Sequence, residues 1–187
     1  QQAHWLHTEV PMANDVTDWK SNMKPYEKNV VGQILKGFAQ TETIVNDYWS
    51  TLVTKWFRKP EVIMMGTTLG SSETIHAEAY SLLNEQLGLD DFSEFMEDEA
   101  TMAKIEALMN VRDNEIVEWS VRDESLHSNA GCWLFRTLME EHPEFNTDKL
   151  VKEIQEAAEM SMKLEFDFID KVFEMGDLEN LTKDELK

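Results

Sequence analysis

Apolar residues recur at alternating steps of four and three along most of this chain, which is the spacing that turns one face of a helix toward a protein interior. Long stretches with this spacing cover residues 25 to 57, 60 to 88, 115 to 143 and 147 to 176. Shorter acidic pieces of the same kind lie between residues 90 and 114. No stretch alternates with a period of two for long enough to indicate a β-sheet. The pattern therefore predicts an all-α protein built as a helical bundle.

Residues with special backbone preferences mark where these helices begin, end and approach one another. Pro60 suits the first turn of the second helix, Gly88 suits the residue that ends it, and Thr147 suits the cap of the last helix. Gly66 and Gly70 lie inside the second helix, where glycine weakens helical structure. The two glycines predict close helix packing or a locally irregular turn at this point.

Each long helix has an apolar seam, the row of residues that its spacing turns toward the interior. Ionisable residues interrupt the seam of the second helix at its middle. Glu73 and His76 are one turn apart on the same helical face, and Tyr80 follows one turn later. The third helix repeats the Glu-x-x-His pattern with Glu124 and His127, again between apolar residues. One copy alone is most simply a solvated pair or a satisfied core histidine. Two copies, each at the centre of an apolar seam, indicate a shared task.

The first long helix has one charged residue, Glu42, at the centre of its seam. Its neighbours Phe38, Val45 and Trp49 are large and apolar, so an outward-facing Glu42 would bring them into water as well. A buried carboxylate is costly unless it is paired or binds a metal. Helical bundles that hold two metal ions take a Glu-x-x-His motif from each of two helices and a Glu from each of two others. The seams therefore predict a dinuclear metal site that includes Glu42.

Size and charge narrow the class of protein further. The chain has 187 residues, enough for a single domain over residues 1–187, and a formal charge of −20, which argues against a nucleic-acid-binding surface. It has no apolar run long enough to span a membrane and no recognisable signal peptide. A single cysteine, Cys132, excludes an internal disulfide and is typical of a reducing cytosol. We therefore expect a cytoplasmic protein with no nucleic-acid or membrane partner.

Four segments of the chain match motifs of one protein family, and the last two are specific motifs. They are Trp5-Leu6-His7-Thr8-Glu9-Val10 with Asp15 and Asp18, Gln40-Thr41-Glu42, Ser72-Glu73-Thr74-Ile75-His76 with Tyr80, and Val121-Arg122-Asp123-Glu124-Ser125-Leu126-His127. Because of these motifs, and over most of its length, the sequence resembles the radical-generating small subunit of class I ribonucleotide reductase. Its segment Thr182-Lys183-Asp184-Glu185, after Met175-Gly176-Asp177, is most similar to phage-encoded members.

The resemblance implies a ferritin-like helical bundle with a dinuclear metal site between the long helices. Glu42, Glu73 and His76 would serve one metal ion, and Glu124 and His127 the other, with Glu73 as a bridge. Glu42 stands where many members of the family have Asp, and carboxylate and imidazole ligands discriminate iron from manganese only weakly. We favour a pair of iron ions, and the residues leave a manganese and iron pair or two manganese ions open.

The resemblance also implies a reaction. The metal pair would react with O₂ and take an electron and a proton from Tyr80, which stands where the family keeps its tyrosyl radical. Trp5 and Asp123, with the metal-bound His76, match the residues that carry the electron and proton to and from the large subunit.

The large subunit would reduce ribonucleotides to deoxyribonucleotides for DNA replication. The chain would thus be a ribonucleoside-diphosphate reductase small subunit, an oxidoreductase that is active only with this partner. The family further implies a homodimer in the cytoplasm, or in the host cytoplasm for a phage-encoded member.

The sequence departs from the family at two places. The family has a further Glu on a helix between the two motif helices, and here the acidic pieces end at Asn114 while the second motif helix begins at Glu115. The tail that docks the large subunit is also absent after Lys187. We hypothesise that the 187 residues are the ordered part of a longer chain, with a segment missing near 114/115 and a missing C-terminal tail.

One alternative function stays open on the residues alone. A ferritin-like di-metal carboxylate oxidase or an iron-storage protein would use the same five residues, Glu42, Glu73, His76, Glu124 and His127. Such a protein would have no need for Tyr80 or for Trp5 and Asp123. A helical scaffold without metal would require three charged seam centres to arise by chance.

Overall fold

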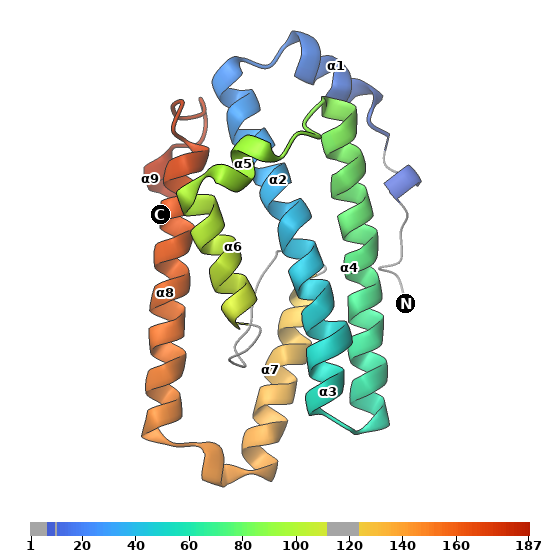
Figure 1. Cartoon of the computed structure of the whole chain (residues 1–187), viewed down its shortest axis with the longest axis vertical. Helices are drawn as coiled ribbons and strands as arrows, with labels where there is room; N and C mark the ends of the chain where they lie inside the picture. The colour runs from blue at the N-terminus through green and yellow to red at the C-terminus, as the bar shows by residue number, and fades with distance from the viewer. Residues whose placement is uncertain (1–6, 10, 112–123) are drawn as a thin grey trace.

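The computed structural model describes residues 7–9, 11–111 and 124–187, and within these ranges the chain forms helices and no β-strand (Figure 1). In chain order the elements are η1 (His7–Glu9), α1 (Ala13–Ser21), α2 (Pro25–Asp47), η2 (Tyr48–Val53), α3 (Thr54–Trp56), α4 (Pro60–Leu87), α5 (Ser93–Glu97), α6 (Glu99–Val111), α7 (Glu124–Glu141), η3 (Pro143–Phe145), α8 (Asp148–Val172) and α9 (Lys183–Leu186). This is the all-α, ferritin-like helical bundle that the sequence predicts. Among these helices none is both long and apolar enough to cross a membrane.

The predicted helix over residues 25 to 57 is present but not uniform. It runs as α2, passes through the π-helical turn η2, and continues as α3, where Phe57 leaves the helix in an extended conformation. The turn is among the most deeply buried parts of the molecule, since Trp49, Leu52 and Val53 all face the interior. The apolar spacing therefore locates the helix correctly and does not reveal its irregular turn.

The glycines of α4 allow that helix to approach α2 and η2 very closely. A Cβ atom on Gly66 would lie 2.7 Å from the carbonyl oxygen of Trp49, and one on Gly70 would lie 3.0 Å from the Cβ of Ser50. Gly66 has no space for a side chain, because real Cβ atoms do not come within 3.0 Å of backbone. At Gly70 a side chain would require Ser50 to shift by a few tenths of an ångström. The prediction of close helix packing at these glycines is thus confirmed. The irregular turn lies on the opposite helix, as η2.

Helix ends agree with the sequence for α4 and for the start of α8. Gly88 adopts a left-handed conformation with φ of 73° and ends α4, and the Thr147 hydroxyl accepts a hydrogen bond of 3.1 Å from the Leu150 N–H at the start of α8. The end of α8 was predicted at Gly176 but lies at Val172. The backbone there turns before Gly176, whose φ of 121° suits glycine and cannot continue a helix.

Two apolar clusters hold the bundle together. The first joins α2, α5, α6 and α8, and its buried members are Val30, Phe95, Ile105, Phe168, Val172 and Phe173. The second joins η2, α4 and α7 through Trp49, Val53, Val62 and Leu134. α7 begins at Glu124, and the residues between 115 and 124 that were predicted to start it lie outside the described ranges.

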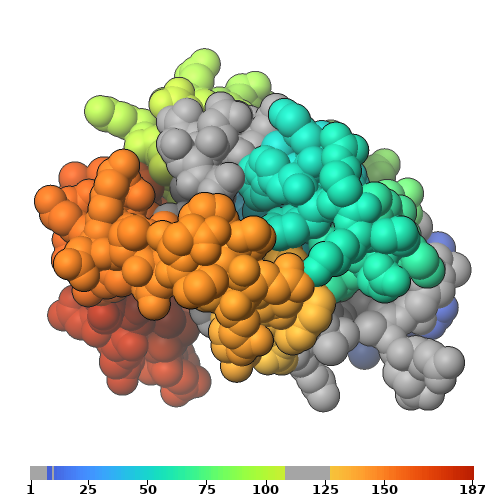
Figure 2. Space-filling view, turned by 90° about the horizontal axis from the view of Figure 1, so that it is seen from below, coloured from blue at the N-terminus to red at the C-terminus, as the bar shows by residue number. Residues whose placement is uncertain are grey.

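The lower end of the molecule brings α7 beside the connection between α3 and α4. Figure 2 views this end, with the η3 region in orange and the α3–α4 connection in teal. An ion pair of 2.7 Å between Lys59 and Glu141 links the two parts. α7 is therefore attached at the end opposite Glu124 as well as through Leu134.

Candidate metal centre

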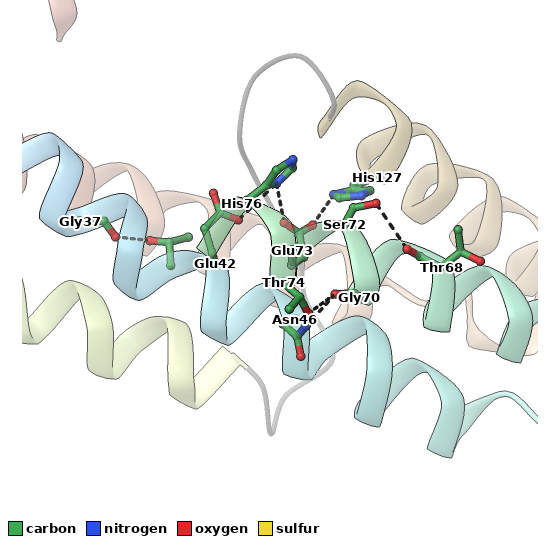
Figure 3. Close-up of polar contacts among 11 residues, drawn as sticks. Gly37, Glu42, Asn46, Thr68, Gly70, Ser72, Glu73, Thr74, His76 and His127 are labelled. Carbon is green, nitrogen blue, oxygen red and sulfur yellow. Dashed lines mark hydrogen bonds and ion pairs between the residues drawn. The ribbon is translucent and has the colours of Figure 1, made fainter. Parts of the chain in front are cut away.

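Three ionisable side chains from three helices are buried together at the middle of the bundle (Figure 3). Glu42 of α2 is 3 % exposed, Glu73 of α4 is 0 % exposed and His127 of α7 is 6 % exposed. His76, one turn after Glu73, completes the group with 11 % of its side chain exposed. All four residues are seam centres in the sequence, and the helices place them side by side because each seam faces the same interior.

Glu73 lies between the two histidines. Its Oε2 atom is 3.0 Å from Nδ1 of His76, and its Oε1 atom is 2.7 Å from Nδ1 of His127. Oε2 of Glu42 lies 3.8 Å from the same Nδ1 atom of His76. A single carboxylate thus has one oxygen toward the histidine of each Glu-x-x-His motif.

Burial and mutual contact change the protonation of these groups. Burial raises the pKa of Glu42 to about 7, and the neighbouring Glu73 carboxylate acts in the same direction, whereas His76 opposes it. Burial alone would also raise the pKa of Glu73, but the close imidazoles of His127 and His76 lower it to about 2. The hydrogen bonds to Glu42 and Glu73 raise the pKa of His76 to about 10. Without a cation, protons therefore compensate the buried negative charge.

The cluster fits a metal cation. Glu42, Glu73 and His76 each offer a ligand atom, and these atoms all lie within 4.8 Å of one another. Within the part of the chain that the structure describes, the buried Oε1 atom of Glu73 makes no hydrogen bond of ordinary geometry, despite its short distance to His127. Carboxylate oxygen and imidazole nitrogen suit iron and manganese, and a cation there would replace the protons that now balance the charge.

Tyr80 occupies the next turn of α4 beyond His76. Its ring is partly buried and packs against Phe38, with the ring centroids 5.2 Å apart. Phe38 itself is 38 % exposed, so this seam neighbour of Glu42 is less buried than the sequence suggests. Tyr80 is therefore only partly buried, and it lies on the same face of α4 as Glu73 and His76.

A tryptophan and an asparagine near the cluster extend what the sequence analysis identified. Trp49 was predicted as a seam residue, and its ring lies beside His127 with centroids 5.8 Å apart. Asn84 was missed, although it is only 1 % exposed and donates a hydrogen bond of 2.9 Å to the carbonyl oxygen of Tyr80. A polar residue beside the seam leucines Leu83 and Leu87 was the available signal.

Several predicted residues lie beyond what the structure describes. Trp5 and Asp123 fall outside the described ranges, as does the junction near 114/115. Glu124 is the first residue of α7, but its side chain is not described. The structure therefore brings together Glu42, Glu73, His76 and His127, while the roles of the remaining residues stay predictions.

Comparison with known proteins identifies relatives over the whole chain. A family model described as "Ribonucleotide reductase, small chain" matches residues 1–116 and 114–187. The chain is 26% identical to the probable ribonucleoside-diphosphate reductase small subunit 048L of Invertebrate iridescent virus 3, with 100% of this chain and 66% of the relative covered.

Two further relatives give a similar result. The chain is 30% identical to the probable small subunit 376L of Invertebrate iridescent virus 6, over 79% of this chain and 43% of the relative. It is 24% identical to the ribonucleoside-diphosphate reductase subunit beta of Chlamydia pneumoniae, over 88% of this chain and 64% of the relative. The chain thus spans less than two thirds of the length of each of these relatives.

Proposed function

The chain belongs to the ribonucleotide reductase small-chain family, and on this premise we propose that it is a radical-generating subunit that serves a separate large subunit. When bound, a pair of iron or manganese ions supplies, by reaction with O₂, the oxidising power that removes an electron and a proton from Tyr80. The oxidising equivalent is then passed to the large subunit, which reduces ribonucleotides to deoxyribonucleotides.

The position of Glu73 between His76 and His127 is the observation that carries this proposal. The three groups come from two helices, and one carboxylate contacts both imidazoles at 3.0 and 2.7 Å. A mononuclear site can also combine two histidines with one carboxylate, but here a second buried carboxylate, Glu42, lies beside His76 as well. Two imidazoles, one on each side of a shared carboxylate, support a site for two ions.

Each residue of the cluster has a distinct task in the proposed site. Glu42 and His76 would hold one ion, His127 and Glu124 would hold the other, and Glu73 would serve both. Burial of these groups excludes water, and it makes their charges interact more strongly with a cation than they would at the surface. Neutral ligand histidines and ionised carboxylates are required, so binding of metal releases the protons that the cluster otherwise holds.

Tyr80 is the residue that we propose is oxidised. It lies one helical turn beyond His76, close enough to the cluster for loss of its hydroxyl proton and an electron to be driven from there. The contact with Phe38 shields one side of the ring from solvent. Trp5 and Asp123, with His76, are the proposed route for the electron and proton toward the large subunit. We further propose that the chain forms a homodimer and that it acts in the cytoplasm.

Metal loading followed by electron paramagnetic resonance tests the proposed function. Protein loaded with iron, manganese or both should bind about two ions per chain and develop a tyrosyl signal on exposure to O₂. Tyr80→Phe should abolish this signal, whereas the matched control Tyr26→Phe should retain it. An unchanged signal in Tyr80→Phe would refute the assignment of Tyr80. Two bound ions with oxidase activity and no tyrosyl signal would instead support an iron-oxidising or iron-storing protein.

A further inference from the structure

Two asparagine side chains connect α2 and α4 on either side of the metal cluster. Asn46 of α2 donates hydrogen bonds from Nδ2 to the carbonyl oxygen of Gly70, at 2.6 Å, and to Oγ1 of Thr74, at 3.0 Å (Figure 3). Both acceptors are on α4, three residues before and one residue after Glu73. The amide therefore fixes α4 to α2 at the turn that carries the shared carboxylate.

The second connection runs in the opposite direction. Asn84 of α4 donates from Nδ2 to the carbonyl oxygen of Leu35 on α2, at 3.3 Å, and to that of Tyr80 on its own helix, at 2.9 Å. Asn84 is 1 % exposed, so its amide is desolvated. The two Nδ2 bonds offset part of that cost, and its Oδ1 atom has no hydrogen-bond partner among the described residues. This contact fixes α2 to the turn of α4 that carries Tyr80.

The two contacts bracket the site along both helices. On α2, Glu42 lies between Leu35 and Asn46, and on α4 the segment from Glu73 to Tyr80 lies between Gly70 and Asn84. Because α2 and α4 pack along their length in opposite directions, sliding or rotation of one helix against the other would break both contacts. Helices packed through apolar side chains alone tolerate small shifts more easily than helices joined by directional hydrogen bonds.

We propose that Asn46 and Asn84 are positioning residues, which hold Glu42 and Tyr80 at fixed places relative to Glu73 and His76. Asn46 sets the separation of the two carboxylates and hence the affinity for metal. Asn84 sets the backbone turn of Tyr80 and hence the surroundings of its ring. The importance of Tyr80 rests on the proposed function, but its placement by Asn84 can be measured without radical or metal.

Asn29 provides a matched control within the same helix. Its Nδ2 donates a hydrogen bond of 3.0 Å to the carbonyl oxygen of Val172, so it joins α2 to α8 by the same kind of bond but distant from the cluster. Asn29→Ala and Asn84→Ala each remove one interhelical hydrogen bond, and Asn46→Ala removes two. If the amides only stabilise the fold, the three variants should differ from the wild type in thermal stability alone.

The test combines Mn²⁺ titration of the metal-free protein with ¹⁹F nuclear magnetic resonance of protein labelled with 3-fluorotyrosine. The chain has three tyrosines, so Tyr80 can be assigned from the Tyr80→Phe variant. Asn46→Ala should weaken Mn²⁺ binding about tenfold, as loss of a residue that orients a ligand does. Asn84→Ala should shift or broaden the Tyr80 resonance and leave that of Tyr26 in place. Asn29→Ala should do neither.

The inference is overturned if Asn46→Ala binds Mn²⁺ like the wild type, or if Asn84→Ala leaves the Tyr80 resonance unchanged. Should Asn46→Ala fail to fold, Asn46→Ser gives the same test, since a serine hydroxyl is too short to reach Gly70. A wild-type protein without a tyrosyl signal after O₂ would refute the proposed function. The Mn²⁺ and ¹⁹F comparisons do not depend on that signal, so they would still test this inference.

Discussion

The helix pair α2–α4 and the helix pair α7–α8 have similar apolar patterns, but the first pair packs tightly and the second does not. Between α2 and α4, glycines bring the backbones together and charged residues are buried between them. Between α7 and α8 a groove of about 560 Å³ stays open, with Phe135, Met139, Leu150 and Ile154 among its lining residues. Apolar spacing thus predicts a helical face, but the partner of that face decides how deeply it is buried.

Exposure along α8 shows the difference within a single helix. At its C-terminal end Phe168 is 7 % exposed in the first apolar cluster, whereas Met160 is 57 % exposed only two turns earlier. Trp133 on α7 is likewise 52 % exposed. The buried cluster therefore lies at the tightly packed pair α2–α4, where side chains have less freedom. This suits metal ligands, because ligands must be held in a fixed geometry.

The largest expected effect in the tight pair concerns Glu73. Glu73→Gln keeps the shape of the side chain but removes the charge that both histidines contact, so Mn²⁺ affinity should fall about a hundredfold or more, beyond the range for residues that only orient ligands. Isothermal titration calorimetry measures this directly. Glu165→Gln is the control, because that carboxylate is exposed and pairs only with Lys104 at 2.8 Å among the contacts described. Equal affinity in both variants would remove Glu73 from the site.

The close approach of the backbones predicts the next effect. Gly66→Ala would place a Cβ 2.7 Å from the carbonyl oxygen of Trp49, and backbone cannot move aside as a side chain can. The free energy of unfolding should fall by about 1–3 kcal/mol, as for other overpacked sites. Urea denaturation at constant pH provides the measurement.

Gly32 is the matched control for this substitution. It also lies in a helix, but a Cβ there would meet only the Leu89 side chain at 3.6 Å. Gly32→Ala should therefore raise the free energy of unfolding, by up to about 1 kcal/mol, because alanine favours the helix. If Gly66→Ala were equally stabilising, the two helices would not be in tight backbone contact.

A smaller, pH-dependent effect is expected where α6 and α8 meet. Asp98 accepts a hydrogen bond of 2.8 Å from the Thr101 N–H at the start of α6 and lies 3.4 Å from Nζ of Lys171 on α8. Burial alone would raise the pKa of Asp98, but the Thr101 N–H and Lys171 outweigh it and lower the pKa. Asp98→Ala should cost about 1 kcal/mol at neutral pH.

The sign of the pH dependence follows from that lowered pKa. The stability that Asp98 contributes is fully present above the ordinary pKa of an aspartate in the unfolded chain, and it is lost as the pH falls through the lower pKa of the folded protein. Denaturation of wild type and Asp98→Ala should therefore converge in acid. A difference that persisted unchanged in strong acid would mean that Asp98 acts through packing rather than charge.

The smallest effect is expected in the open pair. Met160→Ala removes a side chain that is 57 % exposed, so the free energy of unfolding should change by no more than about 0.5 kcal/mol. Phe168→Ala on the same helix should cost about 3 kcal/mol or more, because it empties a packed site. A large loss for Met160→Ala in thermal or urea denaturation would show that this face is covered in solution.

The sequence predicted the helices and the seam centres because both follow from spacing. Glu42, Glu73 and His127 were recognised as charges within apolar seams, and three helices bring them together for that reason. Asn84 gives a weaker signal, because a polar residue beside the seam leucines has no defined role until its two acceptors are known. Likewise, spacing shows that α8 has an apolar face but cannot show that the first half of this face is only partly covered.

The π-helical turn at Tyr48–Val53 affects how this chain can be aligned with its relatives. Such a turn closes its hydrogen bonds one residue later than an α-helix, so it accommodates one additional residue over the same stretch. A relative with an uninterrupted α-helix here should be one residue shorter between Glu42 and Pro60. A gapless alignment would rotate every later position of the helix by about 100° relative to its true counterpart. Glu42 precedes the turn and keeps its register, whereas Trp56 follows the turn and would be assigned to the wrong face.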